Sequence, residues 1–213
     1  MKFLYRHGKL SLALLFTITF LLIYLTNTYV LTTGFYEANG DPLAATPAQG
    51  AIIYEALQKW VYLSSAAYLL IKIGVIALIL HTALFLQDLE VPFRRIVKIV
   101  VLAEFTFLIP AFIKLVSFNY TFQHGNLLDW HKYYILSALS IAGEVPADWY
   151  YTLQTLNLFE VTYWFILAYG ISKITQKPFD ESLRTVVCSY VPGLFLWVVA
   201  VTFFTLMMFP TAG

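Results

Sequence analysis

Residues 60–87 read WVYLSSAAYLLIKIGVIALILHTALFLQ, and their only charged or histidine side chains are those of Lys72 and His81. The hydrocarbon core of a bilayer is about 30 Å thick, and a helix needs about 20 apolar residues to cross it. This segment is long and apolar enough to meet that requirement. It therefore predicts a membrane-spanning helix rather than a surface helix of a soluble protein.

The composition of the whole chain favours the same class. Of its 213 residues, 60% are hydrophobic, 18% aromatic and 12% charged, whereas about 25% of the residues in a soluble domain are charged. Thirteen Lys and Arg residues against twelve Asp and Glu residues give a net charge of +1. This balance provides no basic surface for nucleic acid, so a nucleic-acid partner is not expected. A single cysteine excludes an internal disulfide and a cysteine-based zinc site.

Four further segments have the length and apolarity of a span. We expect an all-α integral membrane protein, a single domain over residues 1–213, with five transmembrane helices. The first span follows a basic start, but its apolar run is longer than the core of a signal peptide, so we expect an uncleaved anchor. The expected spans are residues 10–32, 60–87, 97–118, 150–173 and 184–209, with outer loops at 33–59 and 119–149.

Basic residues gather in the connections on one side of these spans. An excess of Lys and Arg marks the cytoplasmic face, so we expect the N-terminus in the cytoplasm and the C-terminus outside. Arg94, Arg95, Lys98, Lys177 and Arg184 are the expected contacts to cytoplasmic lipid headgroups. The nine basic residues on this side are Lys2, Arg6, Lys9, Arg94, Arg95, Lys98, Lys173, Lys177 and Arg184.

Both outer loops contain segments that suit short helices. Residues 51–59 have helical spacing and a Glu55–Lys59 pair four residues apart. In the aromatic-rich second loop, residues 132–142 are too few to span and suit a helix at the membrane interface, where Trp and Tyr prefer to lie. The aromatic residues are interpreted either as an interfacial belt or as a docking platform for another protein.

Two cytoplasmic segments resemble each other. Residues 92–101 (PFRRIVKIVV) align with residues 178–187 (PFDESLRTVV), and both lead into an outward-going helix. The offset superposes the second and third spans on the fourth and fifth in the same orientation, as in membrane proteins built from parallel repeats. The alternative is shared local chemistry, because proline suits a first helical turn and a basic residue suits the headgroup boundary.

Ionisable side chains within the spans are candidates for function, because charge is costly in the hydrocarbon core. A rise of 1.5 Å per residue places His81 at about the depth of Glu104, and Lys72 at about the depth of Glu160. We therefore expect the pairs His81–Glu104 and Lys72–Glu160, each joining two helices. Pro110 and Pro192 are expected to kink or loosen the third and fifth spans.

Asn157, Glu160 and Trp164 share one face of the fourth span by helical spacing. Three roles fit the intramembrane polar residues: a clasp between helices, a transport or proton site, or a contact to a partner subunit. The candidates for these roles are Lys72, His81, Glu104, Asn157 and Glu160.

Signatures of catalysis are missing from the sequence. It contains no phosphate-binding glycine-rich loop, no nucleophile elbow and no zinc-binding His-Glu-x-x-His helix. His124 and His131 share an outer loop with Asp129, but their spacing is not that of a metal site, so they are interpreted as solvated loop residues. We expect no enzyme, no cofactor and no metal.

One region resembles a known family. Residues 153–164 (LQTLNLFEVTYW), Ala168-Tyr169-Gly170 and the stretch from Pro178-Phe179 to Tyr190-Val191-Pro192 are similar to the last two spans of the YIP family, and particularly to small bacterial members such as those of Bacteroidetes. Five spans with this orientation also fit the family. The resemblance implies a role in membrane organisation or as an accessory protein, with no defined reaction.

The resemblance also bears on partners and location. Eukaryotic members carry a long cytosolic N-terminal region that is implicated in contacts with Rab-type GTPases, whereas only a short stretch precedes the first span here. A Rab-type GTPase is therefore not an expected partner. The expected surroundings are a lipid bilayer, the bacterial cytoplasmic membrane, and other membrane-protein subunits.

Two main functions follow from the sequence. The first is a non-catalytic scaffold or accessory subunit of a larger membrane complex. The alternative is a small oligomeric permease or proton-coupled transporter that uses Lys72, Glu160, His81 and Glu104. An intramembrane enzyme would need a nucleophile beside a base, and only Cys188 or Ser189 near His81 matches in depth.

Overall fold

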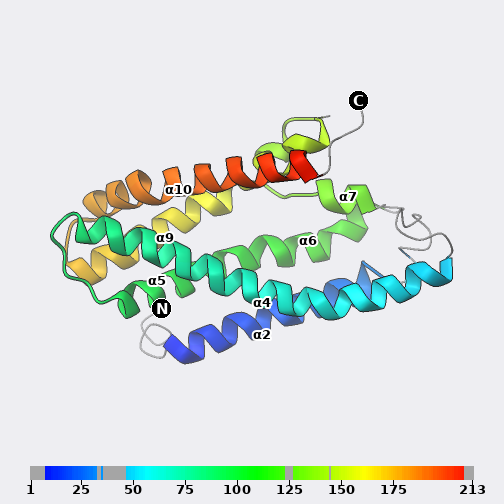
Figure 1. Ribbon diagram of the computed structural model, residues 1–213, viewed down its shortest axis with the longest axis horizontal. Coiled ribbons are helices and arrows are strands. Elements are labelled where there is room, and N and C mark those ends of the chain that lie inside the picture. The colour runs from blue at the N-terminus through cyan, green and yellow to red at the C-terminus, as the bar shows by residue number, and fades with distance from the viewer. Residues whose placement is uncertain (1–7, 33–34, 36–46, 123–126, 144, 209–213) are drawn as a thin grey trace.

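The structure is a computed structural model that describes residues 8–32, 35, 47–122, 127–143 and 145–208. The long helices run side by side in a bundle (Figure 1), so the predicted all-α class is confirmed for this part of the chain. The helices are α2 (Gly8–Tyr29), α4 (Pro47–Phe85), α5 (Phe93–Glu104), α6 (Leu108–Thr121), α7 (Leu127–Lys132), α8 (Tyr150–Thr155), α9 (Leu158–Thr175) and α10 (Phe179–Met208), with 3-10 turns η1 (Phe105–Phe107), η2 (Ala138–Ser140) and η3 (Ala147–Trp149).

The bundle has two chemically different ends. The start of α2, the α4–α5 connection and the α9–α10 connection lie at one end (left in Figure 1), which we name the basic end. The region of α7 and the last turns of α10 lie at the opposite end, named the aromatic end. Lys2 and Arg6 lie outside the described residues. The other basic residues used to orient the chain fall at or next to the basic end: Lys9, Arg94, Arg95, Lys98, Lys173, Lys177 and Arg184.

Within the described residues, four helices are long and apolar enough to cross a membrane, so the prediction of five was wrong. Three of the other predictions, for residues 10–32, 60–87 and 184–209, fall on single helices, and the one for residues 97–118 falls on a helical run interrupted by η1. The four candidate spans are Gly8–Tyr29, Gln58–Phe85, Phe93–Thr121 and Phe179–Met207.

The fourth predicted span, residues 150–173, is divided between α8 and α9. Asn157 is extended (φ −137°, ψ 161°), forms an isolated antiparallel bridge with Ser137, and its side chain accepts a hydrogen bond from the Glu160 N–H at 2.8 Å. An asparagine in this position starts a helix rather than continuing one. The remaining helix has 18 residues, about 27 Å, and carries both Glu160 and Lys173. It is therefore shorter and more polar than the four candidate spans.

Helix α9 packs against α5 and α10. Its buried face is formed by Glu160, Tyr163, Leu167, Ala168 and Ile171. These side chains meet the main hydrophobic core, to which α4 contributes Ala77, Leu80 and Leu84 and α5 contributes Ile96, Ile99 and Val100. The opposite face of α9, with Leu158, Phe165 and Tyr169, is exposed.

The two outer loops differ from the prediction in their helices. Residues 51–59 are helical as expected, but they are part of α4, which begins at Pro47. The prediction of an interfacial helix over residues 132–142 was wrong. Helix α7 ends at Lys132, Leu136 has a positive φ of 53°, and Ser137 is extended. Pairing of Ser137 with Asn157 fixes this extended stretch, and only the short turn η2 follows it.

Pro110 disturbs the third span about one turn before its own position. A proline at 110 has no N–H to donate to the carbonyl of Thr106, and its ring crowds that carbonyl. The backbone forms the 3-10 turn η1 over this region and resumes the α-helix at Leu108. Helix α10, in contrast, continues through Pro192.

Gly170 permits the close approach of α9 to α5. A Cβ atom at this position would collide with the side chain of Ile99, which is itself buried in the core. At Gly74 of α4, the same atom would have no neighbour within 4 Å. A side chain added at Gly170 would therefore clash, whereas one added at Gly74 would not.

Replacing Gly170 with Ala should destabilise the bundle. Overpacking costs about 1–3 kcal/mol, and the better helix propensity of Ala offsets about 1 kcal/mol of it, so we expect a net loss of about 1 kcal/mol in the free energy of unfolding. Gly74→Ala is the matched control and should be neutral or stabilising. Thermal unfolding in detergent measures both, and equal stability of the two variants would contradict the close contact.

Candidate functional site

An ion pair joins two helices in the interior of the bundle. The Lys72 ammonium on α4 donates to Glu104 Oε2 at the end of α5, with an Nζ–Oε2 distance of 2.9 Å. The side chains are 21% and 3% exposed, respectively. Lys72 Nζ also lies 3.9 Å from the centre of the Phe107 ring, a cation–π contact. The charge of Lys72 is thus compensated within the bundle.

Tyr163 connects this ion pair to α9. Its hydroxyl donates to Glu104 Oε1 at 2.9 Å, so both carboxylate oxygens of Glu104 accept a hydrogen bond. The Tyr163 ring is fully buried and packs against the rings of Phe107 and Tyr190, with centroid distances of 5.1 and 5.6 Å. One carboxylate therefore holds α4, α5 and α9 together.

Glu160 forms the second half of the network. Its Oε1 accepts hydrogen bonds from the Tyr190 hydroxyl of α10 at 2.7 Å and from Trp164 Nε1 at 3.0 Å. Its backbone N–H is capped by Asn157 Oδ1 at 2.8 Å. Glu160 and Trp164 share a face of α9, as predicted, whereas Asn157 is not on that helix face because it is the extended residue that caps α9. The central polar network, as the term is used below, consists of Lys72, Glu104, Glu160, Tyr163, Trp164 and Tyr190.

The pairs predicted from depth were wrong. Lys72 bonds to Glu104 rather than to Glu160, and the ring of His81 lies edge-on to that of Phe93, with centroids 5.6 Å apart, rather than against Glu104. Depth along a helix was a correct guide to which residues are interior, but it gives no information about the direction in which each helix points its side chain. Partners could not be assigned from depth alone.

Sequence reasoning missed the two tyrosines of the network. Tyr163 follows Glu160 by three residues, and side chains with this spacing are neighbours on a helix surface. Tyr190 had no such signal, because it reaches Glu160 from another helix. A tyrosine inside a span is a usable sign only when the helix packing is known.

A pocket of about 500 Å³ lies beside the central polar network. Residues of α4, α8, α9 and α10 line it, together with Phe107 and Tyr134. Its charged lining residues are Lys72 and Glu160, and most of the remaining wall is apolar or aromatic. The pocket brings together three of the five polar candidates, Lys72, Asn157 and Glu160, whereas His81 and Glu104 do not line it.

An aromatic cluster covers the other side of the aromatic end. Lys114 Nζ lies 4.3 Å from the Trp130 ring centre and 4.6 Å from that of Tyr134, and Trp130 packs edge-on to Phe118. The His131 imidazole is partly buried, which lowers its pKa, and the nearby positive charge of Lys114 lowers it further. His131 is therefore neutral at pH 7, which avoids a second positive charge beside Lys114.

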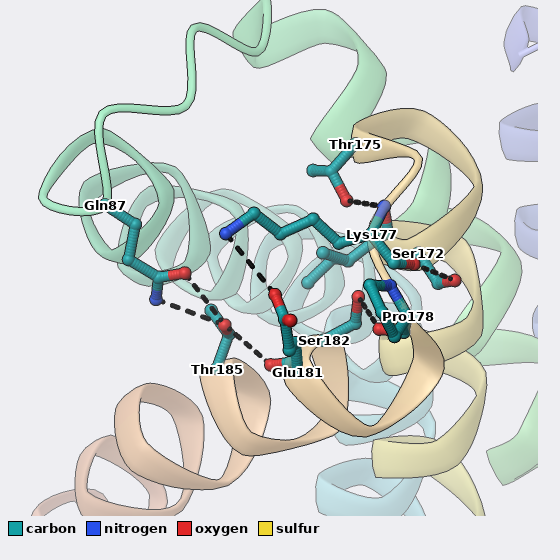
Figure 2. A network of polar contacts seen from close by, with 9 residues as sticks. Gln87, Ser172, Thr175, Lys177, Pro178, Glu181, Ser182 and Thr185 are labelled. Atoms are coloured by element: carbon teal, nitrogen blue, oxygen red, sulfur yellow. Dashed lines mark hydrogen bonds and ion pairs between the residues drawn. The ribbon is translucent and has the colours of Figure 1, made fainter.

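The basic end is closed by a polar network around the α9–α10 connection (Figure 2). Gln87 and Thr185 are hydrogen bonded at 3.1 Å, Lys177 Nζ lies 3.5 Å from Glu181 Oε2, and Ser172 Oγ donates to the Lys177 carbonyl at 2.8 Å. The Gln87–Thr185 bond attaches the first turns of α10 to the segment that follows α4.

The predicted headgroup contacts surround this network. Arg94, Arg95 and Arg184 are exposed, and Lys98 and Lys177 are half-buried. The aliphatic stem of Lys98 packs against Gly8 at the start of α2. The three exposed arginines can thus extend charge toward lipid headgroups, while Lys177 first meets Glu181.

Groups that could support chemistry are dispersed. Within the described part of the chain, no three His, Cys, Asp or Glu residues are grouped closely enough to hold a metal ion, and His124 lies outside it. Cys188 is exposed, and the Ser189 hydroxyl donates to the Thr185 carbonyl at 2.7 Å. The arrangement suits binding and helix association more than bond-making.

Comparison of the chain with protein-family models, with curated proteins and with solved structures gives no significant match. The resemblance to the YIP family therefore stays a prediction from the residues quoted for it.

Replacing Glu104 with Gln should destabilise the protein strongly, because it leaves the Lys72 ammonium without its counter-charge. Loss of one partner of a buried ion pair costs about 3–5 kcal/mol. Lys72→Met combined with Glu104→Leu removes both charges and should recover much of that loss. Equilibrium unfolding in detergent gives the free energies.

The matched control is Glu181→Gln, which removes the carboxylate of the exposed Lys177–Glu181 pair. We expect it to change the free energy of unfolding by no more than about 0.5 kcal/mol. If Glu104→Gln were as mild as this control, the Lys72–Glu104 pair would not be a structural centre.

Proposed function

We propose that the chain is a non-catalytic integral membrane protein of a bacterial cytoplasmic membrane, acting as a scaffold or accessory subunit of a larger membrane complex. In this proposal the basic end faces the cytoplasm, and α9 crosses the bilayer beside α5 and α10, against which it packs. The N-terminus is then cytoplasmic and the C-terminus outside. The resemblance to the last two spans of the YIP family supports this role.

One observation carries the proposal: the charged side chains of the central polar network are hydrogen bonded to other members of the same network. Lys72 and Tyr163 both donate to Glu104, and Tyr190 of α10 and Trp164 of α9 both donate to Glu160. Interhelical bonds of this kind stabilise helix association in membranes. They favour a structural clasp over a reactive centre.

The aromatic end offers a surface for a protein partner. Ile141 is 86% exposed and Trp149 is 56% exposed, and Tyr120 at the end of α6 is also exposed. Aromatic and apolar residues of this type are enriched at protein interfaces. A neighbouring membrane subunit is the occupant that this proposal assigns to them.

The proposal predicts a stable partner. Purification in a mild detergent after chemical crosslinking, followed by mass spectrometry, should recover one or more defined membrane proteins with the chain. Ile141→Lys should reduce that recovery several-fold, because it places a charge in the interface. Leu86→Lys changes an exposed leucine at the basic end and should leave recovery unchanged. Recovery of this chain alone would count against the accessory role.

A small permease is the second candidate, and the pocket beside Lys72 and Glu160 favours it. A proton-coupled transporter would need those two residues together with Glu104 and His81, of which His81 lies apart from the network. Five crossings are few for a self-contained transporter, so this version requires an oligomer.

Proton flux separates the two candidates. For an accessory subunit, proteoliposomes loaded with a pH-sensitive dye and driven by a potassium diffusion potential should acidify no faster than empty liposomes. Flux above that background which disappears in Glu160→Gln but persists in Glu181→Gln would instead support the permease.

A further inference from the structure

The charges around the pocket are unequally compensated. Lys72 and Glu160 line it, and Lys72 is paired with Glu104, which does not line it. Taken as ionised, the three groups carry a net charge of −1, and the negative charge without a cationic partner belongs to Glu160. Burying a carboxylate without a counter-charge is unfavourable. The pocket therefore has a place for one positive charge.

The carboxylate of Glu160 has an oxygen available for a ligand. Oε1 accepts from Tyr190 and Trp164, both neutral donors. Among the described residues, Oε2 has no hydrogen-bond partner, and it is not among the fully buried unpaired atoms. Because Glu160 is only 6% exposed yet lines the pocket, its accessible surface faces that space.

The walls favour an organic cation over a metal ion. Six aromatic side chains line the pocket: Tyr68, Phe107, Tyr134, Tyr151, Tyr190 and Trp197. Aromatic faces attract organic cations, by about 0.5–2 kcal/mol each, and Lys72 over the Phe107 ring is an example within the same cluster. Small hard cations require six or more oxygen ligands, which this mainly apolar wall does not supply.

The entrance to the pocket lies on the apolar outer surface. Ile71 and Val75 of α4 and Leu196 of α10 line the pocket and are also exposed on the outside of the bundle. In a membrane this surface meets lipid, so a ligand reaches the pocket from the bilayer and has to be lipophilic. A volume of about 500 Å³ falls within the range of roughly 300–1,000 Å³ that is usual for sites of drug-sized molecules.

We propose that this pocket binds a lipophilic monovalent organic cation, with Glu160 as its counter-charge and the aromatic side chains as its walls. An anion of the same size is excluded, because Glu160 would repel it and Glu104 already occupies the Lys72 ammonium. The inference requires binding only, so it holds for a static subunit as well as for a permease.

Tetraphenylphosphonium and tetraphenylborate test the charge preference, because they share one shape and carry opposite charges. Equilibrium binding of each is measured on the full-length protein in detergent and in nanodiscs. We expect saturable binding of about one tetraphenylphosphonium per chain and no saturable binding of tetraphenylborate. Equal binding of the two ions, or no saturable binding of the cation, would overturn the proposal.

Three variants locate the binding in the pocket. Glu160→Gln removes the charge and should weaken cation affinity at least about tenfold, an amount equivalent to about 1.4 kcal/mol. Glu181→Gln removes an exposed carboxylate at the basic end and should bind as the parent protein does. Val75→Trp fills the entrance, keeps every donor and acceptor of the central polar network, and should also abolish binding.

Folding is checked for each variant by gel filtration and thermal unfolding. If Glu160→Gln fails to fold, Val75→Trp decides the matter alone, because unchanged affinity in that variant would place the cation elsewhere. The outcome is independent of partner recovery, so failure here leaves the accessory-subunit proposal to its own test.

Discussion

The constraint on which the rest of the structure depends is that a charge inside an apolar bundle needs its partner within the bundle. Lys72 lies in the middle of the apolar stretch of α4, and Glu104 supplies its counter-charge at 2.9 Å. Tyr163 then bonds the second oxygen of Glu104 and brings α9 into the same arrangement. The positions of three helices thus follow from the need to compensate one ammonium group.

Helix class and the approximate ends of most helices could be predicted from apolar runs, because a bilayer imposes a minimum length on any span. The division at Asn157 could not, since it depends on a bridge to Ser137 from a distant loop. The starts of α5 at Phe93 and α10 at Phe179 follow directly from the prolines before them. Local chemistry was therefore a better guide than span length.

The same contrast applies to the site. Composition and depth correctly placed Lys72, Glu104 and Glu160 in the interior, because ionisable residues are rare in spans and stand out. Their partners depend on rotation of each helix about its axis, which the nearly uniform apolarity of α4 and α9 does not reveal. The aromatic walls of the pocket come from α4, η1, α8, α10 and the segment after α7, so no single stretch of sequence contains them.

The short length of α9 has a consequence for how the protein is made. Its 18 residues, with Glu160 in the first turn and Lys173 in the last, only just reach across a hydrocarbon core of about 30 Å, so α9 inserts less readily by itself than the longer candidate spans. Helices α2, α4 and the α5–α6 run leave the ribosome first, and α5 offers the face on which α9 packs. Under the proposed topology, α9 therefore enters the membrane late and as a hairpin with α10, and biogenesis is cooperative at that step.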